Sequence, residues 1–301
     1  MRALNLWSEV PAYLDWDLLG AAGVVRTQAL PEADHRIYFT NGMVDAELGA
    51  LVAYVEPCIG HWNHAPYVTP ERFHTVWMFG TPWAPNQFEI TTDPVVFPYG
   101  PETHQDIRRD ITTLRERRVY YAGMRLGFTQ DPDVQGCTKL YATRNAVVEG
   151  LRAAGIPTTI EGIGWERESR DDPDWDERKR EVMRYGKVDF ALCMENSQFR
   201  NYVSEKIHHG FQSGLVVLYL GNLCIHEWVP EGAFVNLNPL FNPTTKAFNH
   251  AALVDRLRSM TQAEYDDILH AAWRWRREAK LEERCLAQRR RLTNMIIERI
   301  V

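Results

Sequence analysis

The sequence lacks the features that would place it in several simple protein classes. It has no internal repeat and no low-complexity tract, and no apolar run approaches the roughly 18–20 residues that cross a bilayer. Its first residues carry one arginine followed by acidic residues and no apolar block, so we expect no secretory signal. The net charge of −6 shows no general excess of basic residues, which argues against a protein that binds polyanions with its whole surface.

Cysteine is scarce and scattered. The 5 cysteines form no C-x-x-C pair, and their number is odd. This pattern is typical of reduced thiols in a cytoplasmic protein, and it argues against a structural zinc site. We therefore expect a cytoplasmic protein without a structural zinc site.

What is present is an ordinary globular composition, with 45% hydrophobic and 25% charged residues in 301 positions. This length favours two domains. In the first part, short apolar runs bounded by Gly, Pro or Asn predict strands; they lie at 20–27, 36–42, 51–57, 74–80 and 94–100. Their nearly continuous apolarity is typical of a parallel sheet that is covered on both faces.

From residue 117 onward, predicted strands alternate with predicted helices. The strands are expected at 117–124, 158–164, 188–197, 215–221 and 233–238, and the helices at 143–155, around Met183 and at 202–214. This alternation predicts parallel βαβ units and hence the α/β fold class. We expect two α/β domains with a cleft between them, residues 1–130 and 131–270, and a helical tail, 271–301, that packs back across the domains.

The most informative stretch is 188–240, which begins with the apolar strand FALCM and continues into Glu195-Asn196-Ser197. The carboxyl ends of parallel strands are where ligands bind, so Glu195 and Asn196 are candidate binding residues.

A helix expected to begin near Tyr202 would place Glu205 and Lys206 in its first turn. The helix dipole does not favour a lysine there, but an anion held by the backbone N–H groups and the ammonium together would explain it. The neighbouring carboxylate can accept two hydrogen bonds from a sugar diol.

The ordered run F-A-L-C-x-E-N-S, Y-V-S-E-K-I, F-x-S-G-x-V, Y-L-G and P-x-x-A-F-V-N resembles the donor-binding signature of the α-1,3-fucosyltransferases, glycosyltransferase family 10. Upstream, Arg144 and Asn145 open a helix where that family has an Arg-Asn pair. The resemblance implies a GT-B fold, in which two Rossmann-like domains face each other and the C-terminal domain mainly holds the nucleotide sugar. It also implies an inverting transfer that needs no divalent metal and no resident cofactor, with the nucleotide sugar as donor substrate.

The resemblance further implies a role for each matching residue. Lys206 and Arg144 would neutralise the diphosphate of the donor, and Glu205 would bind its ribose. The remaining donor-binding candidates are Asn145, Glu195, Asn196 and Tyr202. Cationic side chains can stabilise a departing diphosphate as it gains charge, which is the work that a metal does in other enzymes.

An inverting transfer needs a general base for the acceptor hydroxyl. In the family that this chain resembles, the base is a glutamate. It follows a strand of the N-terminal domain and precedes a loop with prolines. Glu56 matches, since it follows LVAYV and precedes Pro57. His61 and His64 in the same loop are the competing candidates, because neutral imidazole is a good base near pH 7.

The resulting hypothesis is a hexosyltransferase that transfers fucose from GDP-fucose to a glycan or glycoconjugate. One alternative is a relative that uses another nucleotide sugar or a protein acceptor. An alternative of another class is a non-catalytic glycan- or nucleic-acid-binding protein, in which Trp273, Trp275 and nearby arginines stack on bases. The basic tail could also join two copies of the chain in a homodimer.

His208 and His209 are adjacent in a predicted helix, so their side chains diverge by about 100°. This divergence argues against a shared metal at the pair.

Overall fold

The computed structural model describes residues 2–6, 14–27, 35–40, 50–54, 73–77, 87–89, 114–123, 125, 138–165, 175–199 and 202–300. Contacts divide the chain into two compact units. The first unit comprises residues 1–102, 199–202 and 281–301, and the second comprises 103–198 and 203–280. The domain boundaries expected from the sequence, at 130 and 270, stay predictions.

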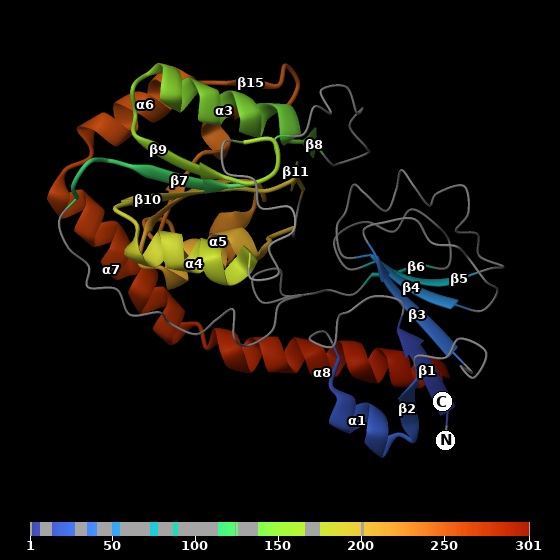
Figure 1. Cartoon of the computed structure of the whole chain (residues 1–301). Helices are drawn as coiled ribbons and strands as arrows, with labels where there is room; N and C mark the ends of the chain where they lie inside the picture. Colours follow the sequence, from blue (N-terminus) through green and yellow to red (C-terminus); the bar gives the residue numbers. More distant parts are fainter. Residues whose placement is uncertain are drawn as a thin grey trace. The chain divides into compact units, whose positions relative to one another are not determined.

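The first unit contains a parallel sheet (Figure 1). Across the sheet, the strands are β2 (Val24–Thr27), β1 (Arg2–Leu6), β3 (His35–Thr40), β4 (Ala50–Tyr54), β5 (Phe73–Trp77) and β6 (Gln87–Glu89). Every neighbouring pair is parallel. The chain starts at β1 inside the sheet and adds β2 on one side. It then adds β3 to β6 in order on the other side of β1, which is the doubly wound arrangement of Rossmann-like domains.

Helices α1 (Trp16–Ala21) and α8 (Leu281–Ile300) belong to the same unit and contact each other. The backbone N–H of Asp15 donates to Thr293 Oγ1 at 2.8 Å, which ties the start of α1 to α8. The end of the chain therefore packs back onto the beginning, as expected for the helical tail.

The second unit also contains a parallel sheet. Its strands, in order across the sheet, are β9 (Thr158–Glu161), β7 (Val119–Ala122), β10 (Phe190–Met194), β12 (Val216–Leu220) and β13 (Val235–Asn236). All neighbours pair in parallel register. The winding direction reverses between β7 and β10, so this is the switch point of the sheet.

Helices cover both faces of this sheet (Figure 1). Helices α3 (Tyr141–Ala153) and α6 (His250–Ser259) lie on one face, and α4 (Trp175–Tyr185) and α5 (Glu205–Gln212) lie on the other. Strands β10 and β12 are buried along their whole length, as nearly continuous apolar runs require.

Helix α7 (Gln262–Glu278) packs against the second sheet near its amino edge. Tyr265 packs edge-on against Phe190, and its hydroxyl donates to the Asp189 carbonyl at 2.9 Å. Thr261 caps this helix, because its side chain accepts from the Glu264 N–H. The Glu264 carboxylate forms an ion pair with Arg256 at 2.7 Å.

The second unit also contains two short antiparallel strand pairs. One joins β8 (Thr138–Lys139) to β11 (Ser197–Gln198), and the other joins β14 (Phe241–Asn242) to β15 (Ala247–Phe248). Two 3-10 turns, η4 (Ile225–Glu227) and η5 (Asn238–Leu240), follow β12 and β13 in the chain.

Two local expectations are wrong. Residues 20–21 end α1 rather than begin a strand, because Asp15 caps that helix by accepting from the Leu18 N–H. Helix α5 begins at Glu205, not near Tyr202, because Ser204 is its cap. The predicted strand at 94–100 lies outside the described residues.

Among the described residues, none of the helices combines the length and apolarity that crossing a bilayer requires.

Candidate functional site

The candidate site lies at the carboxyl edge of the second sheet, beside its switch point. Helix α3, which follows β7, covers one face of the sheet, while α5, which follows β10, covers the other (Figure 1). Loops that leave neighbouring strands toward opposite faces open a crevice at this edge, and doubly wound domains bind ligands there. The cationic candidates Arg144 and Lys206 come from these two helices.

Arg144 is fixed by its neighbours. It is buried, its Nε donates to Tyr121 Oη at 3.0 Å, and its Nη1 donates to Asn196 Oδ1 at 2.5 Å. The guanidinium also lies 5.5 Å from the ring centre of Tyr141. A Cβ at Gly123 would lie 2.5 Å from Arg144 Nη2, so the glycine leaves room for the guanidinium.

Lys206 is held at the start of α5. Its Nζ donates to Ser204 Oγ at 2.9 Å and lies 3.7 Å from Glu195 Oε2 and 3.5 Å from Glu205 Oε1. The Ser204 N–H donates to Glu195 Oε1 at 2.7 Å. The lysine side chain is 19% exposed, so it is not fully enclosed.

The two carboxylates beside Lys206 differ in character. Burial raises the pKa of Glu195, against the opposing effects of Lys206 and Ser204. For Glu205, burial would raise the pKa, but the charges of Lys206, Lys179 and His209 outweigh it and lower the pKa to about 2. Glu205 is therefore ionised at neutral pH and can only accept hydrogen bonds.

The structure brings most of the predicted binding residues to this edge. Arg144 contacts Asn196 and Lys206 contacts Glu195, and Glu195 and Asn196 are consecutive residues that follow β10. Asn145 follows Arg144 in α3 and is partly buried, and Tyr202 is buried just before α5. The roles of these residues toward a ligand stay predictions, and Glu56, His61 and His64 lie outside the described residues.

Sequence reasoning missed the residues that support the site. Tyr121 orients Arg144, Ser204 caps α5, and Tyr219 and Asn238 hydrogen-bond around the end of β12. The only signal for Tyr219 was its place in the Y-L-G part of the family-like run.

The described residues bear on two other interpretations, a metal site and a surface that stacks on bases. No group of three side chains that could hold a metal occurs among them. Trp275 is buried and packs against Phe211, so its ring is not presented as a stacking platform. Trp273 is exposed and lies under the Arg277 guanidinium, which is 4.5 Å from the ring centre.

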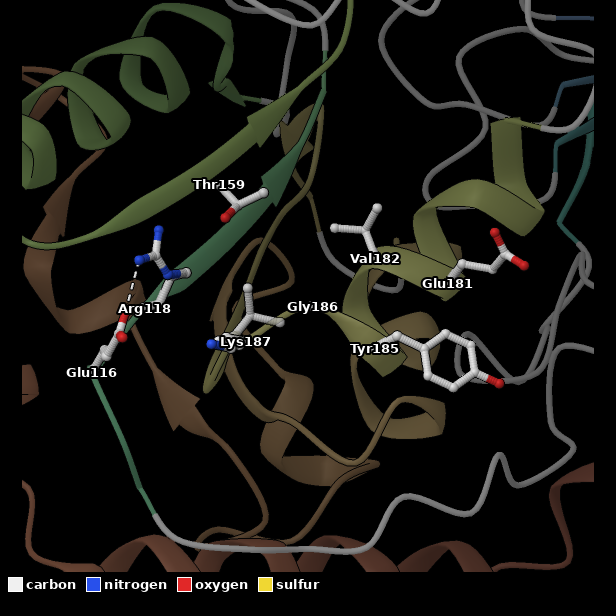
Figure 2. A pocket seen from close by; sticks show the side chains of 9 residues that line it. Glu116, Arg118, Thr159, Glu181, Val182, Tyr185, Gly186 and Lys187 are labelled. Atoms are coloured by element: carbon white, nitrogen blue, oxygen red, sulfur yellow. Dashed lines mark hydrogen bonds and ion pairs between the residues drawn. The ribbon is translucent and has the colours of Figure 1, made fainter.

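A cavity of about 680 Å³ lies at the opposite, amino edge of the same sheet. Figure 2 shows Arg118 and Glu116 in an ion pair at one side and Tyr185 on the other, with Lys187 between them. This cavity is separate from the candidate site, because the two lie at opposite edges of the sheet. Parallel sheets bind ligands at the carboxyl edge, where the candidate site lies.

Comparison with known proteins agrees with the geometry. The family described as "Glycosyltransferase family 10 (fucosyltransferase) C-term" matches residues 134–296, more than half of the chain. No curated protein sequence matches the chain.

Two solved structures share the fold at low identity. One is an alpha1,3-fucosyltransferase with GDP-fucose, with 14% identity, a TM-score of 0.51 and coverage of 89% of this chain and 81% of that chain. The other is a DNA-modifying beta-glucosyltransferase, with 9% identity, a TM-score of 0.53 and coverage of 100% and 99%. These likenesses confirm the GT-B fold class. The chain belongs to glycosyltransferase family 10 and is a glycosyltransferase.

Proposed function

We propose that the protein transfers fucose from GDP-fucose to a hydroxyl group of a glycan or glycoconjugate, with inversion at the anomeric carbon and without a metal. The observation that carries the proposal is the approach of Arg144 and Lys206 to consecutive residues, Asn196 and Glu195, at the switch point of the second sheet. All four residues lie within the part of the chain that matches the family.

In this proposal the two cations bind the diphosphate of the donor. Arg144 presents a planar donor group that its tyrosine and asparagine contacts hold in place, and Lys206 adds a point charge at the amino end of α5. As the bond to the sugar breaks, negative charge grows on the diphosphate, and prearranged cations stabilise that charge. The chain's own side chains thus supply the stabilisation for which other enzymes use a metal.

The remaining residues would orient the donor. Glu205, ionised because its pKa is about 2, can accept both hydroxyl hydrogens of a ribose diol. Asn145, Asn196 and Tyr202 would line the donor pocket. Support for fucose as the sugar comes from the family description and from the related fold of the alpha1,3-fucosyltransferase with GDP-fucose.

Inversion requires a single displacement, in which the acceptor hydroxyl attacks while a base takes its proton. We assign the base role to Glu56, which lies just beyond β4 in the chain. Its carboxylate would remove the acceptor proton as the hydroxyl oxygen bonds to the anomeric carbon.

A donor screen tests the proposal. The protein is incubated with GDP-fucose, GDP-mannose, UDP-glucose or UDP-galactose, with a panel of glycan acceptors and with or without EDTA. We expect sugar transfer and release of GDP from GDP-fucose, unchanged by EDTA. Transfer from a UDP-sugar alone would contradict the assigned donor, and loss of transfer in EDTA would contradict metal independence.

A further inference from the structure

A buried polar network lies below the candidate site, and its central member is Tyr219 on β12. Tyr219 has no exposed surface, and its hydroxyl donates to Glu195 Oε1 at 3.3 Å and accepts from the Asn222 N–H at 3.1 Å. The hydroxyl therefore joins the loop that follows β12 to the carboxylate that follows β10.

Glu195 connects the Tyr219 hydroxyl to the start of α5. The oxygen that accepts from Tyr219 also accepts from the Ser204 N–H at 2.7 Å, and the other oxygen lies 3.7 Å from Lys206 Nζ. Glu195 itself is completely buried, so its contacts are with other parts of the protein. A single carboxylate thus separates the Tyr219 hydroxyl from the ammonium of Lys206.

The backbone around Tyr219 is shaped to keep this arrangement. A Cβ at Gly221 would collide with Glu195 Cγ and would lie 2.7 Å from Tyr219 Oη. Asn238 accepts from the Gly221 N–H at 3.1 Å and donates to the Asn222 carbonyl at 3.1 Å. Because Asn238 fixes this loop, the N–H that orients the tyrosine hydroxyl is itself fixed.

Loss of the hydroxyl would leave two buried groups poorly satisfied. Burial of a carboxylate is costly unless donors surround it, and burial already raises the pKa of Glu195. Glu195 Oε2 has no hydrogen bond among the described residues, so each donor to Oε1 matters for its orientation. The Asn222 N–H would also lose the acceptor that it has in Tyr219.

We infer that Tyr219 is a positioning residue for the transfer reaction: its hydroxyl fixes Glu195, and Glu195 fixes the start of α5 and the ammonium of Lys206. This inference rests on the proposed function, in which Lys206 binds the donor diphosphate. Neither Tyr219 nor Glu195 touches the substrate. Glu195 therefore has a structural task in place of direct donor contact.

The test compares Tyr219→Phe with Tyr265→Phe. Both changes remove one buried tyrosine hydroxyl, but Tyr265 donates to the Asp189 carbonyl before β10, at the amino edge of the sheet. Three quantities are measured for each variant: the affinity for GDP, the hydrogen exchange of the Ser204–Lys206 amides, and the thermal midpoint.

Loss of this buried hydrogen bond predicts a fall of about tenfold in GDP affinity for Tyr219→Phe, with faster exchange of the Ser204–Lys206 amides. Tyr265→Phe should lower the thermal midpoint similarly and leave the affinity and those amides within about twofold of wild type. Normal GDP affinity and normal exchange in Tyr219→Phe would overturn the inference, as would equal losses in both variants.

The exchange measurement separates this inference from the proposed function. If the wild-type protein binds no GDP, the proposed function fails, while faster exchange confined to Tyr219→Phe still supports the coupling from Tyr219 to α5. Where Tyr219→Phe itself folds poorly, Glu195→Gln keeps the side-chain shape and should speed exchange of the same amides. Unchanged exchange in a folded Glu195→Gln would overturn the inference.

Discussion

At the residue scale, the chemistry depends on one ammonium group shared between two carboxylates. Lys206 lies 3.7 Å from Glu195 Oε2 and 3.5 Å from Glu205 Oε1. Burial raises the pKa of Glu195, whereas the influence of Lys206, Lys179 and His209 outweighs burial and lowers the pKa of Glu205. The two carboxylates beside Lys206 therefore have different tasks. Glu195 is enclosed and supports the start of α5, whereas the partly exposed Glu205 can contact a ligand.

Glu205→Gln is expected to reduce stability in a pH-dependent way. The folded-state pKa is about 2 and the ordinary value is 4.5, so the ionised carboxylate contributes stability above pH 4.5, and this is lost as the pH falls toward 2. In denaturant unfolding, the difference between wild type and Glu205→Gln should therefore be largest at neutral pH and shrink below about pH 4.5. A difference that grows on acidification would show that the cations do not stabilise this carboxylate.

Glu56→Gln tests the assigned base. The amide cannot accept the acceptor proton, so transfer should fall by about 10²–10⁴-fold, while GDP affinity stays at the wild-type value. Rates and GDP titrations are measured on the same preparation. Near-normal transfer would move the base role to His61 or His64, for which single alanine variants serve as the comparison.

At the element scale, the start of α5 combines a cap with the binding site. The Ser204 side chain accepts from the Lys206 N–H and from Lys206 Nζ, so it stabilises the helix and holds the ammonium. Thr261 caps α7 in the same way but contacts none of the candidate site residues in the part of the chain described. The two caps form a matched pair in which only one should affect binding.

Ser204→Ala and Thr261→Ala should each cost about 1 kcal/mol of stability through the lost cap. Only Ser204→Ala should also weaken GDP binding, because Lys206 loses its 2.9 Å partner. Denaturant unfolding and GDP titration of both variants check this. Equal GDP affinities would show that the cap and the binding site are independent.

The sequence predicted elements well where the signals were local. The helix expected at 143–155 is α3, and Gly155, with a φ of +73°, follows the end of that helix. The supporting network could not be predicted, because Glu195, Tyr219 and Asn238 lie far apart in the chain and meet only through the parallel pairing of the strands. For the start of α5, Ser204 is a preferred N-cap residue, and the expected start near Tyr202 did not use this local signal.

At the scale of the whole molecule, the chain contains two doubly wound units, each with its own parallel sheet. All the described candidate binding residues except Tyr202 belong to the second unit. A ligand that binds this unit in its folded state must stabilise it by mass action.

Added GDP should therefore protect the second unit against unfolding. At a concentration about 100 times its dissociation constant, GDP should add about 2.7 kcal/mol to the free energy of unfolding. Calorimetric scans with and without GDP measure the shift, and hydrogen exchange of β10 and β12 locates it. The absence of any shift at millimolar GDP would show that the second unit is not the nucleotide-binding part.

The most direct measurement of the central claim is a calorimetric titration of GDP into wild type, Lys206→Ala and Lys187→Ala. Lys187 lies beside the cavity at the amino edge of the same sheet, so it controls for the loss of one positive charge. Removal of a charge-assisted contact predicts about a 10- to 100-fold weaker affinity for Lys206→Ala and an unchanged affinity for Lys187→Ala. Wild-type GDP affinity in Lys206→Ala would contradict the account.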